Sequence, residues 1–318
     1  MTEKISANFR CQICGGNETS GNYKAREMML GLRMVFHYSQ CGECGTLWLT
    51  DPPADFAPYY PSQYYSFAES AGLRKRAKDY LRKERDRTYF GKGNMVGRFV
   101  ASQCGDEALL SVSKLNIRRD ARILDVGCGS GKLLRRMAAF GFDNLTGIDP
   151  FLSNEIHDGP RLQIRKCRLE DLAGEKYDLV MFHHSLEHMA DPGAALRAAA
   201  ELLPEGGKCL VRLPVVAYAW DKYGTNWVQL DPPRHIWVPT EKAMRMLAGS
   251  AGFRVEFVEY DSTGLQFWGS ELYSRDVPFK DGGAGNFRFQ LGRLAEFRVM
   301  AEALNRNARG DQSVFLLG

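Results

Sequence analysis

The chain has 318 residues, room for one large domain with an appendage or for two domains. Hydrophobic residues at 44% and charged residues at 25% are ordinary for a globular protein, and a net charge of +4 does not demand a nucleic-acid partner. No apolar run approaches the roughly 18 residues that span a bilayer, and residues 1–10 lack a signal-peptide core. We therefore expect a cytoplasmic protein.

Two CxxC pairs stand near the N-terminus with 26 residues between them, Cys11 and Cys14, then Cys41 and Cys44. Four thiolates in a tetrahedral array suit structural Zn²⁺. Disulfides are not expected in a reducing cytosol. A thioredoxin-like redox role fits poorly with two CxxC pairs, each of which we call a knuckle. The sequence predicts a zinc-binding module over residues 1–53, with a β-hairpin between the pairs that has residues 32–38 as one strand.

Residues 54–118 are predicted to hold a tyrosine-rich linker and a basic helical region. The linker, 57–66, has two tyrosine pairs whose rings, Tyr65 among them, could cap a cofactor, stack on a sugar or simply pack across a core. Residues 74–87 contain eight Lys/Arg and three Asp/Glu. That pattern suits an exposed helix with i,i+4 charge pairs, either a solvated face or a docking surface for phosphate groups or anionic lipid.

A glycine-rich loop follows a short apolar run that reads as a buried parallel strand. Gly127, Gly129 and Gly131 allow a tight turn and close approach of a ligand. A dinucleotide fingerprint would need its third glycine one residue later, where Lys132 stands. Asp125 would repel a pyrophosphate and attract a cationic amine.

Further strands are expected in chain order at 144–149, 162–167, 177–184, 208–214, 253–260 and 313–317. Asp149 ends the second strand, where a carboxylate can accept both hydroxyls of a ribose. Glu170 and Asp171 follow the third strand, and either could accept from an adenine amine. Residues 262–312 would form an insertion between the last two strands, with a helix over 286–307 that could act as a lid.

As an ordered set over residues 122–214, these motifs resemble class I S-adenosylmethionine-dependent methyltransferases. The resemblance implies an α/β fold, a Rossmann-like seven-stranded sheet over 119–318, joined to the small N-terminal zinc-ribbon module. It implies S-adenosyl-L-methionine as cofactor. The residues expected to bind it are Asp125, Gly127, Cys128, Gly129, Gly131, Asp149, Pro150, Glu170, Asp171, His183 and Tyr65.

The zinc module and tyrosine linker resemble bacterial methyltransferases of sugar and surface-polysaccharide pathways. A second resemblance is to ribosomal RNA methyltransferases with an N-terminal zinc ribbon. The first implies O-methylation of a sugar, nucleotide sugar or lipid-linked glycan. The alternatives are an RNA methyltransferase and a non-catalytic cofactor-binding scaffold. Amino-methylating relatives carry an Asn/Asp-Pro-Pro-Phe/Tyr motif after the fourth strand. At that position this chain has His183-His184-Ser185-Leu186, which disfavours methylation of an exocyclic amine.

The substrate side is expected in the long aromatic connection 215–238, at the carboxyl end of a parallel strand. Its candidate substrate-binding residues are Trp220, Tyr223, Trp227 and Arg234. A hydroxyl acceptor benefits from a general base, for which His235, His188 and His184 are the candidates, a structural role being the alternative for each. The acceptor is expected to be a small molecule or glycan, without nucleic acid. Contact of the basic segment with an anionic membrane, and the oligomeric state, stay open.

Overall fold

The computed structural model describes residues 9–60, 73–282 and 293–318, and the chain divides into two compact units. Unit 1 comprises Met1–Tyr60, His184–Ala200 and Val211–Gly318, and unit 2 comprises Pro61–His183 and Glu201–Leu210. Among the described residues, no helix combines the length and apolarity needed to cross a membrane. The division into 1–53, 54–118 and 119–318 follows the chain order alone and stays a prediction.

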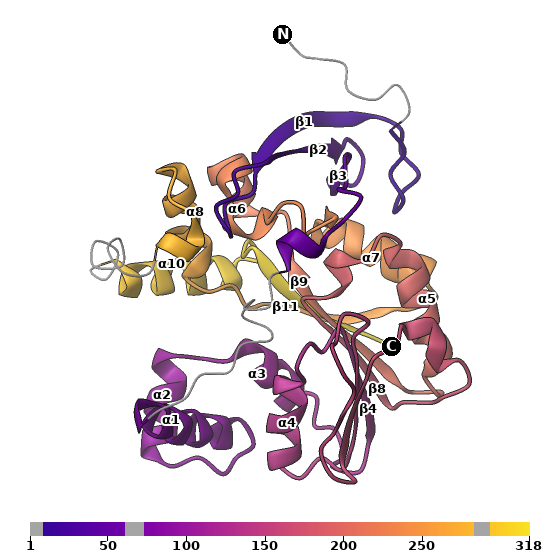
Figure 1. Ribbon diagram of the computed structural model, residues 1–318, viewed down its shortest axis with the longest axis vertical. Coiled ribbons are helices and arrows are strands. Elements are labelled where there is room, and N and C mark those ends of the chain that lie inside the picture. The colour runs from indigo at the N-terminus through magenta and orange to yellow at the C-terminus, as the bar shows by residue number, and fades with distance from the viewer. Residues whose placement is uncertain (1–8, 61–72, 283–292) are drawn as a thin grey trace. The chain divides into compact units, whose positions relative to one another are not determined.

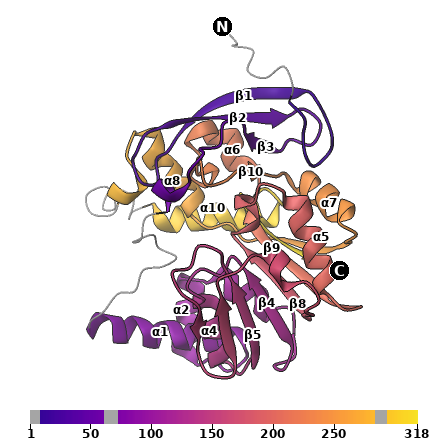
Figure 2. The same ribbon diagram turned by 45° about the vertical axis from the view of Figure 1, so that its right-hand side comes forward.

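The N-terminal part of unit 1 is an antiparallel sheet with the order β1-β2-β3-β10. Figure 1 labels β1, β2 and β3, and Figure 2 also labels β10. Its strands are β1 (Thr19–Arg26), β2 (Val35–Cys41), β3 (Leu47–Leu49) and β10 (Trp237–Val238). The predicted hairpin between the cysteine pairs is confirmed, with Tyr23 opposite Tyr38, but β2 begins later than expected. The Glu27 carboxylate accepts the backbone N–H groups of Leu30 and Leu32 at 2.6 and 2.8 Å, which holds this segment in a turn before β2 starts.

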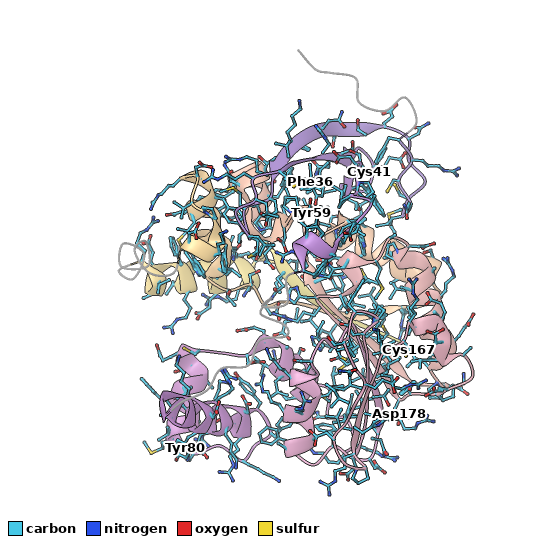
Figure 3. The ribbon with its side chains drawn as sticks, viewed as in Figure 1. Phe36, Cys41, Tyr59, Tyr80, Cys167 and Asp178 are labelled. Carbon is cyan, nitrogen blue, oxygen red and sulfur yellow. The ribbon has the colours of Figure 1, made fainter. Side chains whose placement is uncertain are left out.

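Aromatic rings fill the core of unit 1. The rings of Phe36 and Tyr59 meet edge to face at 5.7 Å between centroids (Figure 3). Tyr23 meets Trp220 in the same manner at 4.8 Å. Burial of a ring such as that of Phe36 stabilises the fold by roughly 1.5–3 kcal/mol. The first tyrosine of the linker is therefore a core residue of unit 1.

The rest of unit 1 is built from two antiparallel strands and several helices. The strands are β11 (Val255–Tyr260) and β12 (Gln312–Leu317), with Val258 opposite Phe315. In the chain, α8 (Leu265–Ser274) and α10 (Leu294–Arg306) stand between them. The helix predicted over 286–307 is found as α10, and 286–292 lie outside the described residues. Also in this unit are α6 (Tyr218–Tyr223), α7 (Glu241–Ser250) and most of α5 (Pro192–Leu202).

Unit 2 is an α/β unit around a largely parallel sheet with the order β8-β4-β5-β7-β6 (Figure 2). Its strands are β4 (Arg122–Val126), β5 (Asn144–Ile148), β6 (Ile156–His157), β7 (Leu162–Arg165) and β8 (Leu179–His183). The strand β9 (Lys208–Pro214) begins in unit 2 beside β8 and ends in unit 1 beside β12. All predicted strands are present. The additional strand β6 has two residues and pairs antiparallel with β7, too short for any periodicity in sequence to reveal.

The helices of unit 2 are α1 (Leu73–Tyr89), α2 (Met95–Gln103), α3 (Glu107–Ser113) and α4 (Lys132–Ala139). The predicted basic helix is confirmed as α1, but only part of it is an exposed face. Tyr80 is 55% exposed, whereas Arg85 and Asp86 are buried. Asp86 accepts two hydrogen bonds from Arg136 of α4, both at 2.8 Å. Asp86, one of the acids among these basic residues, therefore joins α1 to α4 inside unit 2.

Candidate functional site

The glycine loop after β4 is folded tightly onto β5 in unit 2. The N–H groups of Gly127 and Cys128 both donate to the carbonyl of Ile148, at 2.8 and 3.1 Å. Gly131 begins α4 with φ of +70°, and a Cβ there would lie 2.0 Å from Cδ1 of Ile164. Glycine is therefore required at this position both by the backbone angle and by the neighbouring side chain.

Two buried carboxylates lie at the carboxyl ends of the neighbouring strands β4 and β5. Asp149 accepts from the N–H groups of Gly129 at 3.1 Å and Phe151 at 2.8 Å, so it fixes the loop. Burial, with the nearby charge of Asp149, raises the pKa of Asp125 to about 7. A cationic group bound beside Asp125 would favour its ionised form. This arrangement suits a ligand with an amine and a ribose.

The other predicted cofactor residues differ in their surroundings. Burial raises the pKa of the Cys128 thiol, which is neutral at physiological pH. The carboxylate of Asp171 accepts a hydrogen bond of 2.8 Å from the backbone N–H of Arg168 at the start of a 3₁₀ helix (Leu169–Leu172). One of its two oxygens therefore already has a partner. Glu170 and Pro150 are exposed, His183 ends β8 half-buried, and Tyr65 lies outside the described residues. Their roles in binding stay predictions.

A cluster of histidines and a carboxylate follows β8, within unit 1. His184 has φ of +51°, which is uncommon for a residue with a side chain, and its N–H donates to Arg212 at 2.8 Å. Its Nδ1 lies 3.2 Å from Oε1 of the fully buried Glu187. Burial alone would raise the pKa of Glu187, but the hydrogen bond with His184 and the nearby imidazoles lower it to about 2. Glu187 is therefore ionised inside unit 1.

His188 and His235 complete this cluster, with ring centroids 5.0 Å apart. Nδ1 of His188 lies 2.8 Å from the carbonyl of Arg234 and 3.3 Å from the hydroxyl of Tyr60. Nδ1 of His235 lies 2.8 Å from the carbonyl of Gln229. Burial lowers the pKa of His235 to about 4, so its ring is neutral near pH 7 and can accept a proton or bind a cation.

The aromatic connection 215–238 lies mainly in the core of unit 1. Trp227 is fully buried, and its indole N–H donates to Asp311 at 2.8 Å. Trp220 and Arg234 are also buried, the latter paired with Asp231. Tyr223 is half-buried. The rings expected to face a substrate thus have a packing role, because the connection folds back to fill unit 1 and to add β10 to the N-terminal sheet.

The four cysteines of the CxxC pairs come together in the N-terminal part of unit 1. Sγ of Cys11 lies 3.5 Å from that of Cys44, and Sγ of Cys14 lies 3.4 Å from that of Cys41. All four sulfurs are within 4.8 Å of one another. A tetrahedral zinc with bonds of about 2.3 Å would hold sulfurs about 3.8 Å apart. The hydrogen bond with Cys44 lowers the pKa of the Cys11 thiol to about 4, which favours a thiolate. The cluster fits Zn²⁺.

Sequence reasoning did not select Glu187, Asp231 or Tyr60 as site residues. Glu187 had a visible signal, since it is the one acid in the short stretch Ser185-Leu-Glu-His188 directly after β8. Asp231 and Tyr60 had none. They come to the histidines only through the folding of the long connection and of the linker.

Comparison with known proteins places this geometry in a family. Residues 97–257 match the family model described as a methyltransferase domain, which is half of the chain. The chain therefore belongs to this methyltransferase family, and its mixed α/β fold with a largely parallel sheet is the fold of such enzymes, here with a small N-terminal module.

Curated relatives share part of this domain. The ubiquinone biosynthesis O-methyltransferase of Azorhizobium caulinodans is 34% identical over 152 residues, 42% of this chain and 59% of that protein. The enzyme of the same name from Cereibacter sphaeroides is 37% identical over 131 residues, 36% of this chain and 52% of that protein. The chain thus spans about half the length of the curated relatives it matches. Their names do not support the predicted resemblance to sugar methyltransferases.

Among solved structures, similarity extends to the cyclopropane synthase MmaA2 of Mycobacterium tuberculosis, with 17% identity, a TM-score of 0.44, and coverage of 66% of this chain and 82% of that one. The magnesium protoporphyrin IX methyltransferase of Synechocystis, solved with bound S-adenosylhomocysteine, has 21% identity and a TM-score of 0.39, with 60% and 94% covered.

Proposed function

We propose that the protein transfers a methyl group from S-adenosylmethionine to a hydroxyl oxygen of a small-molecule acceptor. The observation that carries the proposal is the pair of buried carboxylates, Asp125 and Asp149, beside the glycine loop of a chain whose residues 97–257 match a methyltransferase domain. Asp125 would pair with the amine of the cofactor's amino-acid tail, and Asp149 would accept from its ribose.

An oxygen acceptor is favoured over a nitrogen acceptor by two facts. The curated relatives are named as O-methyltransferases, and the sequence after β8 lacks the amine-methylation motif. Because those relatives act in ubiquinone biosynthesis, an aromatic hydroxyl of a quinone precursor is the first acceptor to test. A sugar or glycan hydroxyl is the second, since the rings on which that prediction rested lie mainly in a core.

The chemistry is an in-line displacement at carbon. The bond between the methyl carbon and the sulfonium sulfur breaks, its electron pair stays on sulfur, and the acceptor oxygen bonds to the carbon while its proton goes to a base. Accurate alignment can contribute on the order of 7–11 kcal/mol to such a step. His235, His188 and His184 remain the candidate proton acceptors.

We also propose that Cys11, Cys14, Cys41 and Cys44 hold one structural Zn²⁺. The spacing of their sulfurs and their enclosure in unit 1 support a closed four-thiolate site, which has no position for a substrate. When bound, the metal would cross-link the two knuckles and stabilise the sheet that contains β1 to β3.

Methyl-labelled S-adenosylmethionine incubated with the protein and a fractionated cell extract tests the transfer. We expect label in a small-molecule fraction, lost with Asp149→Asn because the ribose contact and the loop are weakened, and retained with the exposed control Asp158→Asn. Label in a ribonuclease-sensitive fraction would support the RNA alternative instead. Cofactor binding without transfer to any fraction would indicate a scaffold.

A further inference from the structure

The buried carboxylate of Glu187 and the rings of His188 and His235 form a group of metal-binding atoms that lies apart from the cysteine cluster. One ligand atom from each residue lies within 4.8 Å of the other two. All three belong to unit 1. We propose that these residues bind a divalent transition-metal ion, in addition to the ion at the cysteines.

The hydrogen bonds of the two rings leave the same nitrogen of each ring available. Nδ1 of His188 and Nδ1 of His235 each lie 2.8 Å from a backbone carbonyl oxygen. A carbonyl oxygen only accepts, so in each neutral ring the proton is on Nδ1 and the lone pair is on Nε2. Metal-binding histidines are oriented in the same way, with the second nitrogen donating to a carbonyl or carboxylate.

Acceptor atoms converge at this point, with Nδ1 of His184 lying 3.2 Å from one oxygen of Glu187 and Arg234 paired with one oxygen of Asp231. Nε2 of His235 lies 3.9 Å from Oε1 of Glu187 and 3.8 Å from Oδ2 of Asp231, both too far for a hydrogen bond. Oε2 of Glu187, which is fully buried, has no hydrogen-bond partner among the described residues. Arg234 compensates the charge of Asp231, so the unpartnered Oε2 of Glu187 is the atom that a bound cation would satisfy.

The spacing and chemistry of the group fit a small first-row ion. Nitrogen and oxygen ligands on a tetrahedral ion with bonds of about 2.1 Å lie about 3.4 Å apart, so the 3.9 Å separation between His235 and Glu187 needs a small closure. Two imidazoles and one carboxylate are typical of Fe²⁺, Mn²⁺ or Zn²⁺, and they leave positions open for other ligands. Asp231 is close enough to serve as a fourth ligand or to orient a bound water.

The role of the site rests on the proposed function, whereas its existence does not. An ion with open positions would bind the acceptor through its hydroxyl oxygen and lower the pKa of that hydroxyl, so that the proton is lost to solvent near neutral pH. The inferred acceptor class is thus a hydroxyl compound able to coordinate a metal through oxygen. In this arrangement His188 and His235 are ligands, and neither acts as the general base.

The test uses full-length protein with its cysteine-bound metal retained, titrated with Mn²⁺ and followed by the paramagnetic resonance of free Mn²⁺. Mn²⁺ prefers nitrogen and oxygen ligands to thiolates, so it reports this site and not the cysteine cluster. We expect one Mn²⁺ per chain, with affinity reduced at least roughly tenfold by Glu187→Gln and by His188→Gln, as for loss of a ligand. Glu155→Gln is the matched control, an exposed carboxylate beside His157 that should change nothing.

His188 is half-buried, so its variant is expected to fold even if the fully buried Glu187 does not tolerate substitution. Absence of Mn²⁺ binding to the unmodified protein, or equal binding by folded His188→Gln, would overturn the inference. Methyl transfer measured on the same samples separates the two proposals. Transfer without metal binding removes only the metal site, and metal binding without transfer removes only the proposed function.

Discussion

Asp125 is a buried carboxyl group with a raised pKa, and it is the residue that we propose binds the amine of the cofactor. Its pKa is raised to about 7, far above the ordinary value of 3.8, chiefly by burial. A carboxyl group with a raised folded-state pKa binds its proton more tightly when folded. Its burial therefore lowers the stability of the fold as pH rises from about 4 to about 7 and has no further effect above that.

The same titration predicts pH-dependent cofactor binding. The ionised carboxylate attracts a cationic amine, so affinity for S-adenosylmethionine should rise as pH increases through about 7 and level off above it. Isothermal titration over this range measures it, and Asp125→Asn should bind more weakly at high pH with a flatter profile. An unchanged profile in the Asn variant would assign the titration to another group.

Gly131 gives a second prediction at this scale. Gly131→Ala should destabilise the protein by more than about 2 kcal/mol, because left-handed backbone strain adds to the contact with Ile164. Gly141→Ala is the matched control, with φ of +89° and open space around its Cβ, and should cost only about 1 kcal/mol. Urea denaturation compares them, and equal losses would show that the Ile164 side chain moves aside.

The role of a single residue could be predicted from sequence where the spacing of neighbouring residues determines the chemistry. The CxxC pairs and the glycine loop are of this kind, since each is a local pattern whose geometry follows from a few adjacent residues. Asp231, by contrast, joins the histidine group because the connection after β9 folds back. No local pattern encodes that contact.

Among elements, the junction of α1 with α4 depends on buried charge. Arg136 of α4 pairs with Asp86 of α1 at 2.8 Å and with Asp106 at 2.7 Å. Arg136→Met should destabilise unit 2 by about 2 kcal/mol, because Asp86 loses both hydrogen bonds from Arg136 and keeps only those from Arg85. The exposed pair of Arg118 with Asp120 supplies the control, and Arg118→Ala should have no measurable effect. Thermal unfolding distinguishes the two, and similar midpoints would argue that water solvates Asp86.

The strand β8 was predictable because its first four residues form a continuous apolar run, as burial on both faces of a parallel sheet requires. The aromatic connection 215–238 was harder to interpret. Its tryptophans suggested a surface for sugar rings, but a ring that fills a core and a ring that stacks on a ligand are the same residue in sequence. Only the burial of Trp227 decides between them.

At the scale of the whole molecule, metal content is the measurable property. We expect close to one Zn²⁺ per chain from the cysteine cluster, reduced by Cys41→Ser and unchanged by Cys104→Ser, whose thiol is exposed and outside the cluster. Elemental analysis and thermal unfolding measure both, and the loss of zinc should also lower the unfolding temperature. A protein that keeps its zinc after Cys41→Ser would place the ion elsewhere.

The arrangement of the whole chain was the least predictable feature. By position along the sequence, the chain divides into an N-terminal module and an enzyme domain. By contacts between residues, however, residues 9–60 belong to the same compact unit as segments after residue 183. Cytoplasmic location and contact of α1 with membranes stay predictions.

The pairing of β3 with β10 has a consequence for chimeric proteins and for evolutionary loss of the N-terminal strands. Trp48 stacks on Trp237 at 6.0 Å, Leu49 donates to the carbonyl of Ile236, and the hydroxyl of Tyr38 donates to the carbonyl of His235. Residues of β2 and β3 thus hydrogen-bond to the backbone at His235 and Ile236, next to one of the histidines. A chimera that grafts these strands onto another methyltransferase, or a gene that loses them, would disturb the histidine group as well, so module and histidines should be gained and lost together.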